Sequence, residues 1–219
     1  MDSIYGRYFD QTKIWNQLSE SSVGRLLRQL GLSCQKPLYR AYQQSPETVK
    51  QWKGEVFPGI KKKAKRVGAT IYFQDESGIR SDFHSGKTWA VKGQTPIIVA
   101  TGARFSLNMV GAISTRGQFR FMVVKGSVNS DRLCDFLDKL MHNAEKPIFL
   151  IWDGHPTHRS KKVKDHIASF DGKLEVYVLP SYSPELNPIE QAWNNVKGHG
   201  IGRRIVFGPD QLKSVVLSQ

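Results

Sequence analysis

Cysteine is scarce in this 219-residue chain, which has only Cys34 and Cys134. The two lie far apart and lack the spacing of a metal site, so we expect free thiols in a reducing compartment rather than a disulfide framework. The sequence also has no long apolar run, which excludes a membrane-spanning helix of the usual length, and its first residues do not resemble a secretory signal peptide. We therefore expect a cytoplasmic protein with no membrane partner.

Acidic residues are few relative to basic ones. Asp and Glu number 19 against 32 Lys and Arg, which gives a net charge of +13, and residues 1–70 alone carry +8 of it. This balance favours a polyanion such as nucleic acid as the partner, although charge alone does not exclude a generic basic protein. The length suits one good-sized domain plus a small one, and a hydrophobic content of 39% can support a core.

A short amphipathic helix is predicted from Ser19 to about Gly31, because apolar residues recur there at helical spacing. Its other face carries Arg25, Arg28 and Gln29. This pattern suits the DNA-reading helix of a helix-turn-helix, in which these three side chains would contact DNA. An ordinary amphipathic helix with a solvated face has the same pattern and is common.

A basic connection follows this helix. Residues 34–44 have the irregular composition of a linker or wing, in which Lys36 and Arg40 would contact the DNA backbone. A second helix is predicted from Ser45 to about residue 65, kinked or split at Pro58 and Gly59. Near its end are three lysines that either lie along phosphates or complement the helix dipole: Lys61, Lys62 and Lys63.

From residue 69 onwards the sequence changes to strand-like runs. Strands are predicted at 70–74, 88–91, 106–113, 118–124, 148–152 and 174–179, and helices at 130–142, 158–169, 186–197 and 209–219. Several strands in series, followed by alternating strands and helices, indicate a mixed α/β sheet flanked by helices.

Two acids, Asp75 and Asp153, each end an apolar strand-like run. If those strands are parallel and adjacent, both carboxylates lie at the same edge of the sheet, where α/β proteins bind ligands. Neighbouring carboxylates repel unless a cation joins them, and Mg²⁺ prefers oxygen ligands. Two such ions can activate the attacking oxygen and stabilise the leaving oxygen of a phosphodiester. For either Asp alone, a turn is the commoner explanation.

A third acid, Glu190, stands near the start of the helix predicted over 186–197. Asn187 is a good N-cap and Pro188 suits the first helical position, so Glu190 takes the capping-box position. That role is structural, but the same placement also presents the carboxylate to a metal ion. Trp193, one turn later, is expected in the core.

Further polar residues lie near these acids. His155 and His158 lack the additional ligands of a zinc site, so they orient substrate or neighbouring groups, or serve local structure. Glu76 should point away from Asp75 if the strand continues past it. Three basic residues after Asp153 are candidates for phosphate contacts: Arg159, Lys161 and Lys162.

Three strings together point to a family: FQDESGIR (73–80), LIWDGHPTHRS (150–160) and LPSYSPELNPIEQAWNNVK (179–197). They resemble the mariner-superfamily transposases, specifically the bacterial insertion-sequence branch with a DDE endonuclease domain. Residues 21–47 are similar to the winged helix-turn-helix and linker of the same family.

The resemblance implies an RNase H-like α/β domain over 67–219, behind a partial winged helix-turn-helix over 1–45 and a basic helical linker over 46–66. It implies that Asp75, Asp153 and Glu190 are catalytic and hold two Mg²⁺ ions, for which Mn²⁺ can substitute. The implied activity is DNA transposition. A homodimer would bind double-stranded element ends, hydrolyse the phosphodiester and join the freed 3′-OH to target DNA.

The chain also departs from the family pattern. The 36 residues between Asp153 and Glu190 slightly exceed the usual spacing. Only about 18 residues precede the presumed DNA-reading helix, and the sequence stops within its last predicted helix, so we expect a shortened copy. An alternative function is therefore a catalytically idle DNA-binding remnant, or a regulator of a full-length transposase. A nuclease of the same fold that cuts DNA without joining strands is a third.

Overall fold

The computed structural model describes residues 19–35, 41–82, 89–97, 101–202 and 204–218, and the chain divides into two compact units, 1–40 and 41–219. The first unit contains the predicted amphipathic helix, α2 (Glu20–Gln29), which begins at the N-cap Ser19 and is followed by Gly31 with a φ of 76°. Lys36 and Arg40, predicted to contact DNA, lie outside the described residues.

The second unit begins with the predicted basic helix. Ser45 caps α3 (Pro46–Gln51) by accepting a hydrogen bond from the backbone N–H of Thr48, and the helix continues through a π-helical turn (Trp52–Val56) into α4 (Phe57–Val67). The expected break at Pro58 and Gly59 is therefore wrong, because the irregular turn precedes them. The ring of a proline inside a helix clashes with the carbonyl four residues earlier. The wider π-helical turn before Pro58 relieves that clash.

Five strands form one mixed sheet in the order β3-β2-β1-β4-β5. Their bounds are β1 (Thr70–Arg80), β2 (Ser106–Ser114), β3 (Phe119–Val124), β4 (Ile148–Trp152) and β5 (Leu174–Val178). β1 pairs with β2 and β2 with β3 in antiparallel fashion, whereas β4 runs parallel to both β1 and β5. The predicted mixed α/β, RNase H-like sheet is confirmed.

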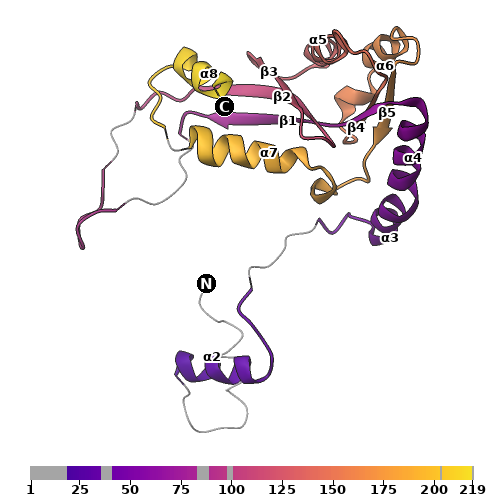
Figure 1. Cartoon of the computed structure of the whole chain (residues 1–219). Coiled ribbons are helices and arrows are strands. Elements are labelled where there is room, and N and C mark those ends of the chain that lie inside the picture. The colour runs from indigo at the N-terminus through magenta and orange to yellow at the C-terminus, as the bar shows by residue number, and fades with distance from the viewer. Residues whose placement is uncertain (1–18, 36–40, 83–88, 98–100, 203, 219) are drawn as a thin grey trace. The chain divides into compact units, whose positions relative to one another are not determined.

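Helices cover both faces of this sheet (Figure 1). α5 (Ser130–Met141) and α6 (Lys161–Ala168) pack on the face that carries Tyr72, and the other face, which carries Phe73, is covered by α4, α7 (Ile189–Asn195) and α8 (Pro209–Leu217). Single-turn or π-helical segments occur at Pro156–Arg159, Pro184–Leu186 and Val196–Ile201. Side chains alternate between the faces of a strand, so Asp75 shares its face with Phe73 and α7.

Two expectations from the sequence differ from the structure here. Residues 89–91 are not a strand, and Trp89 is fully exposed; residue 88 lies outside the described residues. The basic helix predicted over 158–169 is interrupted, because Ser160 caps α6 and separates it from the preceding 3₁₀ turn.

The two cysteines are free thiols, as expected. In the described part of the chain, no helix has both the length and the apolar character needed to span a bilayer.

The position of α7 depends on a close approach to β2. Gly111 pairs with Asp75 across the sheet, and a Cβ atom at Gly111 would lie 2.7 Å from the indole ring of Trp193. Trp193 belongs to α7, is 1% exposed and lies one turn after Glu190, and its burial in the core was predicted. The missing side chain of Gly111 therefore allows α7 to lie against the sheet directly beside Asp75.

We expect Gly111→Ala to push Trp193 and α7 away from the sheet and to lower the free energy of unfolding by about 1–3 kcal/mol, as overpacking typically does. Urea denaturation measures this loss. Gly59→Ala is the matched control, because a Cβ there meets no atom within 4 Å and the residue lies in α4. Alanine favours helix over glycine, so the control should be as stable as the parent or more so. Equal effects of the two substitutions would contradict this account.

Candidate active site

Asp75 and Asp153 lie where the parallel pairing of β1 and β4 stops. The last paired residues are Phe73 and Ile151, and Asp153 directly follows the end of β4. The prediction that Asp75 ends its strand is wrong, because β1 stays paired with β2 as far as Arg80. β1 and β4 are adjacent and parallel, which is the condition under which the sequence placed both acids at one edge of the sheet.

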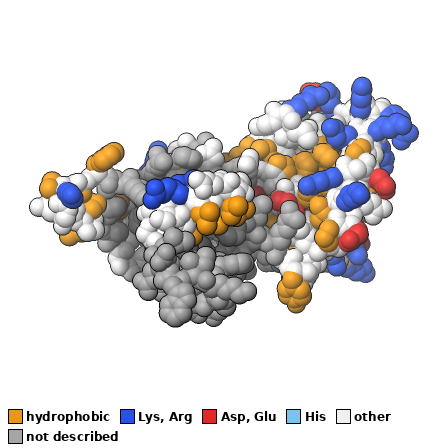
Figure 2. Space-filling view, turned by 90° about the horizontal axis from the view of Figure 1, so that it is seen from below, with side chains coloured by type: hydrophobic (Ala, Val, Ile, Leu, Met, Phe, Trp, Pro, Cys, Tyr) orange, Lys and Arg blue, Asp and Glu red, His pale blue; other side chains and the backbone are white. Residues whose placement is uncertain are grey.

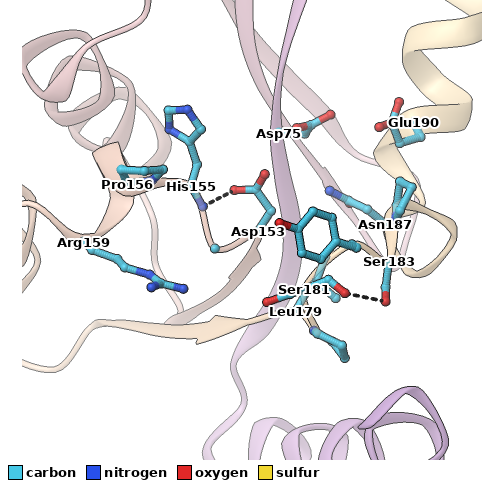
Figure 3. Close-up of a pocket in the computed structure, with 14 residues that line it drawn as sticks. Asp75, Asp153, His155, Pro156, Arg159, Leu179, Ser181, Ser183, Asn187 and Glu190 are labelled. Carbon is cyan, nitrogen blue, oxygen red and sulfur yellow. Dashed lines mark hydrogen bonds between the residues drawn. The ribbon is translucent and has the colours of Figure 1, made fainter. Parts of the chain in front are cut away.

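Glu190 shares a cavity of about 550 Å³ with these two acids. Figure 3 shows the Glu190 carboxylate directed towards Asp75, with the side chain of Asp153 entering from the neighbouring strand end. Arg159, from the 3₁₀ turn after β4, lines the same cavity. All three predicted catalytic residues and one predicted phosphate contact thus meet in one place.

The start of α7 is held by a contact that the sequence did not reveal. The side-chain amide of Asn187 donates a hydrogen bond to the backbone carbonyl of Gln74, at 3.1 Å, in a buried position. The predicted capping box is therefore wrong: Asn187 makes no side-chain cap, α7 begins at Ile189, and no side-chain hydrogen bond caps it. Because Gln74 directly precedes Asp75, the Asn187 amide ties the helix of Glu190 to the strand of Asp75.

The buried side chain of His158 supports Asp153. The Nδ1 atom of His158 lies 3.1 Å from a carboxylate oxygen of Asp153, and its Nε2 atom lies 3.0 Å from Glu76. The His158 side chain is 2% exposed, and its imidazole stacks on Trp152 with ring centroids 4.4 Å apart. Glu76 points away from Asp75, as the sequence predicted for a continuing strand, and its partner on the other face is His158.

These contacts set the charge of the pair. Burial alone would lower the pKa of His158, but hydrogen bonds to Asp153 and Glu76 outweigh it and raise the pKa to about 9. The pKa of Asp153 is lowered chiefly by its hydrogen bond from His158, and the backbone N–H of His155 donates a further hydrogen bond at 2.9 Å. Asp153 is therefore an anion at neutral pH, with an imidazolium beside it.

Asp75 is in the opposite situation. Burial, followed by repulsion from Glu190, raises the pKa of Asp75 to about 7. None of the ion pairs formed by the described residues includes Asp75 or Glu190. The negative charge shared by these two side chains is therefore compensated by protonation, or by a cation from solution.

The donor set fits a hard divalent cation. It consists of carboxylate oxygens from Asp75, Asp153 and Glu190, which is the ligand type that Mg²⁺ and Mn²⁺ prefer. Among the described residues, no three acidic, histidine or cysteine side chains lie close enough together to hold a metal ion as they stand. The acids surround the cavity, but they do not form a closed ligand set.

The predicted DNA contacts lie on both units of the chain. Arg25, Arg28 and Gln29 are exposed on α2, in the first unit. On the second unit, Figure 2 shows Lys and Arg side chains gathered at the end where Figure 1 places α4 and α6. There, Lys61, Lys62, Lys161 and Lys162 are exposed, and Lys63 is half-buried. Lys63 pairs with Glu175 at 2.5 Å, and Lys162 pairs with Asp131.

Two substitutions at this site should change stability in opposite directions. Between pH 3.8 and about 7, the folded chain retains a proton on Asp75 that the unfolded chain has lost, so stability falls as the pH rises through this window. Without divalent ions at pH 8, Asp75→Asn should therefore raise the free energy of unfolding, on the order of 1 kcal/mol after allowance for solvent screening.

Asp153→Asn is the matched control, because it removes the anionic partner of the buried His158 and should destabilise the chain at the same pH. Thermal denaturation across pH 5–8 measures both effects. Stabilisation by Asp75→Asn should shrink as the pH falls below about 7. Destabilisation by Asp75→Asn at pH 8 would overturn this account of the site.

Two family models match the chain. Residues 70–213 match the family described as DDE superfamily endonuclease, and residues 16–56 match the family described as winged helix-turn helix. A curated relative from Shigella sonnei, named insertion element IS630 uncharacterized 39 kDa protein, is 27% identical over 126 residues, which are 56% of this chain and 36% of the relative.

Solved structures of Mos1 transposase share the fold. The paired-end complex with the left transposon end has a TM-score of 0.66 at 19% identity and covers 92% of this chain and 62% of that one. The catalytic domain of Mos1 mariner transposase has a TM-score of 0.56 at 16% identity, and covers 82% of this chain and 84% of that one. The chain spans about a third of the curated relative and less than two thirds of the longer Mos1 chain. Since the DDE match takes in most of the chain and all three acids of the cavity, this protein belongs to the DDE superfamily endonucleases.

Proposed function

We propose that this chain is a DNA transposase that hydrolyses phosphodiester bonds at the ends of a mobile element and transfers the freed 3′-OH to target DNA. The observation that carries the proposal is the cavity in which Asp75, Asp153 and Glu190 meet. The names of its relatives, an insertion-element protein and Mos1 transposase complexes, support the same conclusion.

Asp75, Asp153 and Glu190 would hold two Mg²⁺ ions, with Mn²⁺ as a substitute. The bound ions would activate a water molecule, or the 3′-OH of the cut strand, and neutralise the charge on the leaving oxygen. The chain itself positions the groups: His158 fixes the orientation of Asp153 and keeps it ionised, and Asn187 fixes the start of the helix that carries Glu190. Arg159, in the same cavity, would bind a phosphate of the substrate strand.

The remaining parts would bind double-stranded DNA. We assign DNA binding to residues 1–45, a connecting role to 46–66 and catalysis to 67–219, with a homodimer as the active form. In the first part, Arg25, Arg28 and Gln29 would reach DNA from α2, together with Lys36 and Arg40 from the linker. On the second unit, the phosphate contacts would come from Lys61, Lys62 and Lys161, which are exposed on α4 and α6.

The catalytic assignment is tested by nicking of DNA that carries the terminal inverted repeats flanking the gene. Parent protein should nick it with Mg²⁺ or Mn²⁺ and not with EDTA. Asp75→Asn, Asp153→Asn and Glu190→Gln should each lower the rate by at least about 10²-fold, because each removes a charged ligand from the site of reaction. The Glu145→Gln variant, which changes an exposed acid that does not line the cavity, should retain metal-dependent cutting.

Gel-shift binding of the same DNA separates the alternatives. Metal-dependent nicking that all three substitutions abolish would support the endonuclease. Retarded DNA without any nicking would favour the idle DNA-binding remnant, and nicking without strand joining would favour the nuclease. If the Asp75→Asn or Glu190→Gln variant cut DNA as fast as the parent, the assignment of the acids would be wrong.

The ion pairs of the second unit predict which lysines contact DNA. Lys62 and Lys161 are exposed, so Lys62→Ala and Lys161→Ala should weaken binding and each lower the slope of log affinity against log salt by about 1. Lys63 is engaged by Glu175 and packs over Phe149, so Lys63→Ala should leave the slope unchanged. Fluorescence anisotropy at several salt concentrations measures this, and a reversed ranking would show that the Lys63 pair opens for DNA.

A further inference from the structure

Gln44 connects the segment after the first unit to the loop that borders the catalytic cavity. Its side-chain nitrogen, Nε2, donates hydrogen bonds to the backbone carbonyl of Tyr182 at 2.9 Å, to the hydroxyl of Ser183 at 3.1 Å and to the carboxylate of Glu185 at 2.8 Å. An amide group has two hydrogens, so three acceptors at these distances share them. All three acceptors lie 138–141 residues away in sequence and belong to one short loop.

That loop has a conformation that needs support. Tyr182 has a φ of 56°, in the left-handed region that non-glycine residues rarely adopt. Such a conformation costs about 1–3 kcal/mol and persists only where neighbouring contacts hold it. One of these contacts is made by Gln44, because the Tyr182 carbonyl accepts a hydrogen bond from it.

The same loop leads directly into the catalytic residues. A 3₁₀ turn, Pro184–Leu186, connects it to Asn187, whose backbone N–H donates a hydrogen bond to the carbonyl of Pro184. Asn187 in turn holds the start of α7, and Glu190 lies in the first turn of that helix. A shift of the loop therefore moves the Asn187 amide and the Glu190 carboxylate together.

On its other side, Gln44 is fixed to the chain that enters the second unit. Its backbone N–H donates to the carbonyl of Ala41 at 3.0 Å, and the next residue, Ser45, caps α3. The helix that follows buries Trp52 in the same core as Phe73 of β1. Residue 44 is thus the point where the segment that follows the first unit becomes attached to the catalytic unit.

We propose that Gln44 is a positioning residue that couples this entering segment to the active-site loop, and through it to Asn187 and Glu190. The inference rests on the proposed function, because it assigns Gln44 a part in the reaction of that cavity. It also gives the entering segment a regulatory role: when the segment is displaced, the Glu185 and Tyr182 contacts are lost and Glu190 is held less well.

Hydrogen exchange of the full chain tests the coupling without relying on activity. Gln44→Ala should raise the exchange rate of the backbone amides of Leu186, Asn187 and Glu190 by roughly tenfold or more, because local opening of the loop becomes less costly. Gln43→Ala is the matched control at the neighbouring exposed position and should leave these amides unchanged. Unchanged exchange in the Gln44→Ala variant would overturn the proposal.

Kinetics and a charge swap sharpen the test. In the nicking assay, Gln44→Ala should lower kcat about tenfold with little change in KM for DNA, since misplacement of a catalytic group acts on the chemical step. Gln44→Glu should lower kcat further, because the new carboxylate is repelled by the Glu185 carboxylate and the Tyr182 carbonyl that it faces. Adding Glu185→Gln to Gln44→Glu should recover part of the rate, because the amide and the carboxylate then exchange places.

The outcomes separate this proposal from the proposed function. The positioning role would be overturned if Gln44→Ala raised KM for DNA without lowering kcat, because Gln44 would then act through DNA binding. It would also be overturned if the double variant, Gln44→Glu with Glu185→Gln, recovered none of the rate, because the effect of Gln44 would then be one of general stability. If the parent protein cut no DNA at all, the proposed function would fail, while the hydrogen-exchange comparison of Gln44→Ala with Gln43→Ala would still decide whether Gln44 holds the loop.

Discussion

Mutual repulsion of carboxylates in one cavity is the constraint on which the rest of this site depends. Side chains with the same charge do not converge by attraction, so the backbone and its supports must hold them together. The parallel pairing of β1 with β4 brings Asp75 and Asp153 to neighbouring positions. The hydrogen bond from the Asn187 amide to the Gln74 carbonyl then holds the start of α7, and with it Glu190, against β1. The interactions that offset this repulsion are therefore the packing of the hydrophobic core and the buried hydrogen bonds.

The docking of α7 illustrates how this offset is built. Trp193 is almost fully buried and packs edge-on against Phe119 with ring centroids 5.4 Å apart, which stabilises the helix on the sheet. That packing is possible only because position 111 has no side chain, since a Cβ there would lie 2.7 Å from the indole. Gly111 is also the strand partner of Asp75. One close approach thus sets both the depth of the helix in the core and the height of Glu190 above the strand of Asp75.

Local sequence patterns were sufficient to predict much of this architecture. Apolar runs that end in Asp75 and Asp153 correctly indicated strands, and the Ser45-Pro46 pair correctly indicated a helix start, because each depends on neighbours in sequence. The interpretation failed where the deciding partner is distant. Asn187 has the composition of an N-cap, yet its amide is taken by Gln74, 113 residues away. Asp75 has the sequence context of a strand end, yet pairing with β2 extends β1 as far as Arg80. Gln44 carries no local signal at all, because its partners begin at Tyr182.

The two sides of the cavity differ in how their charge is compensated. Asp153 is paired with a cation, the imidazolium of His158. The hydrogen bond from His158 lowers the pKa of Asp153, and the hydrogen bonds that His158 makes to Asp153 and Glu76 raise the pKa of His158 to about 9. Asp75 and Glu190 have no such partner among the described residues, and the pKa of Asp75 rises to about 7. A site whose own cations balanced every acid would gain little from a metal ion. Here the uncompensated charge lies between Asp75 and Glu190, so a divalent cation entering the cavity gains most from that pair, while Asp153 meets it already ionised and already oriented.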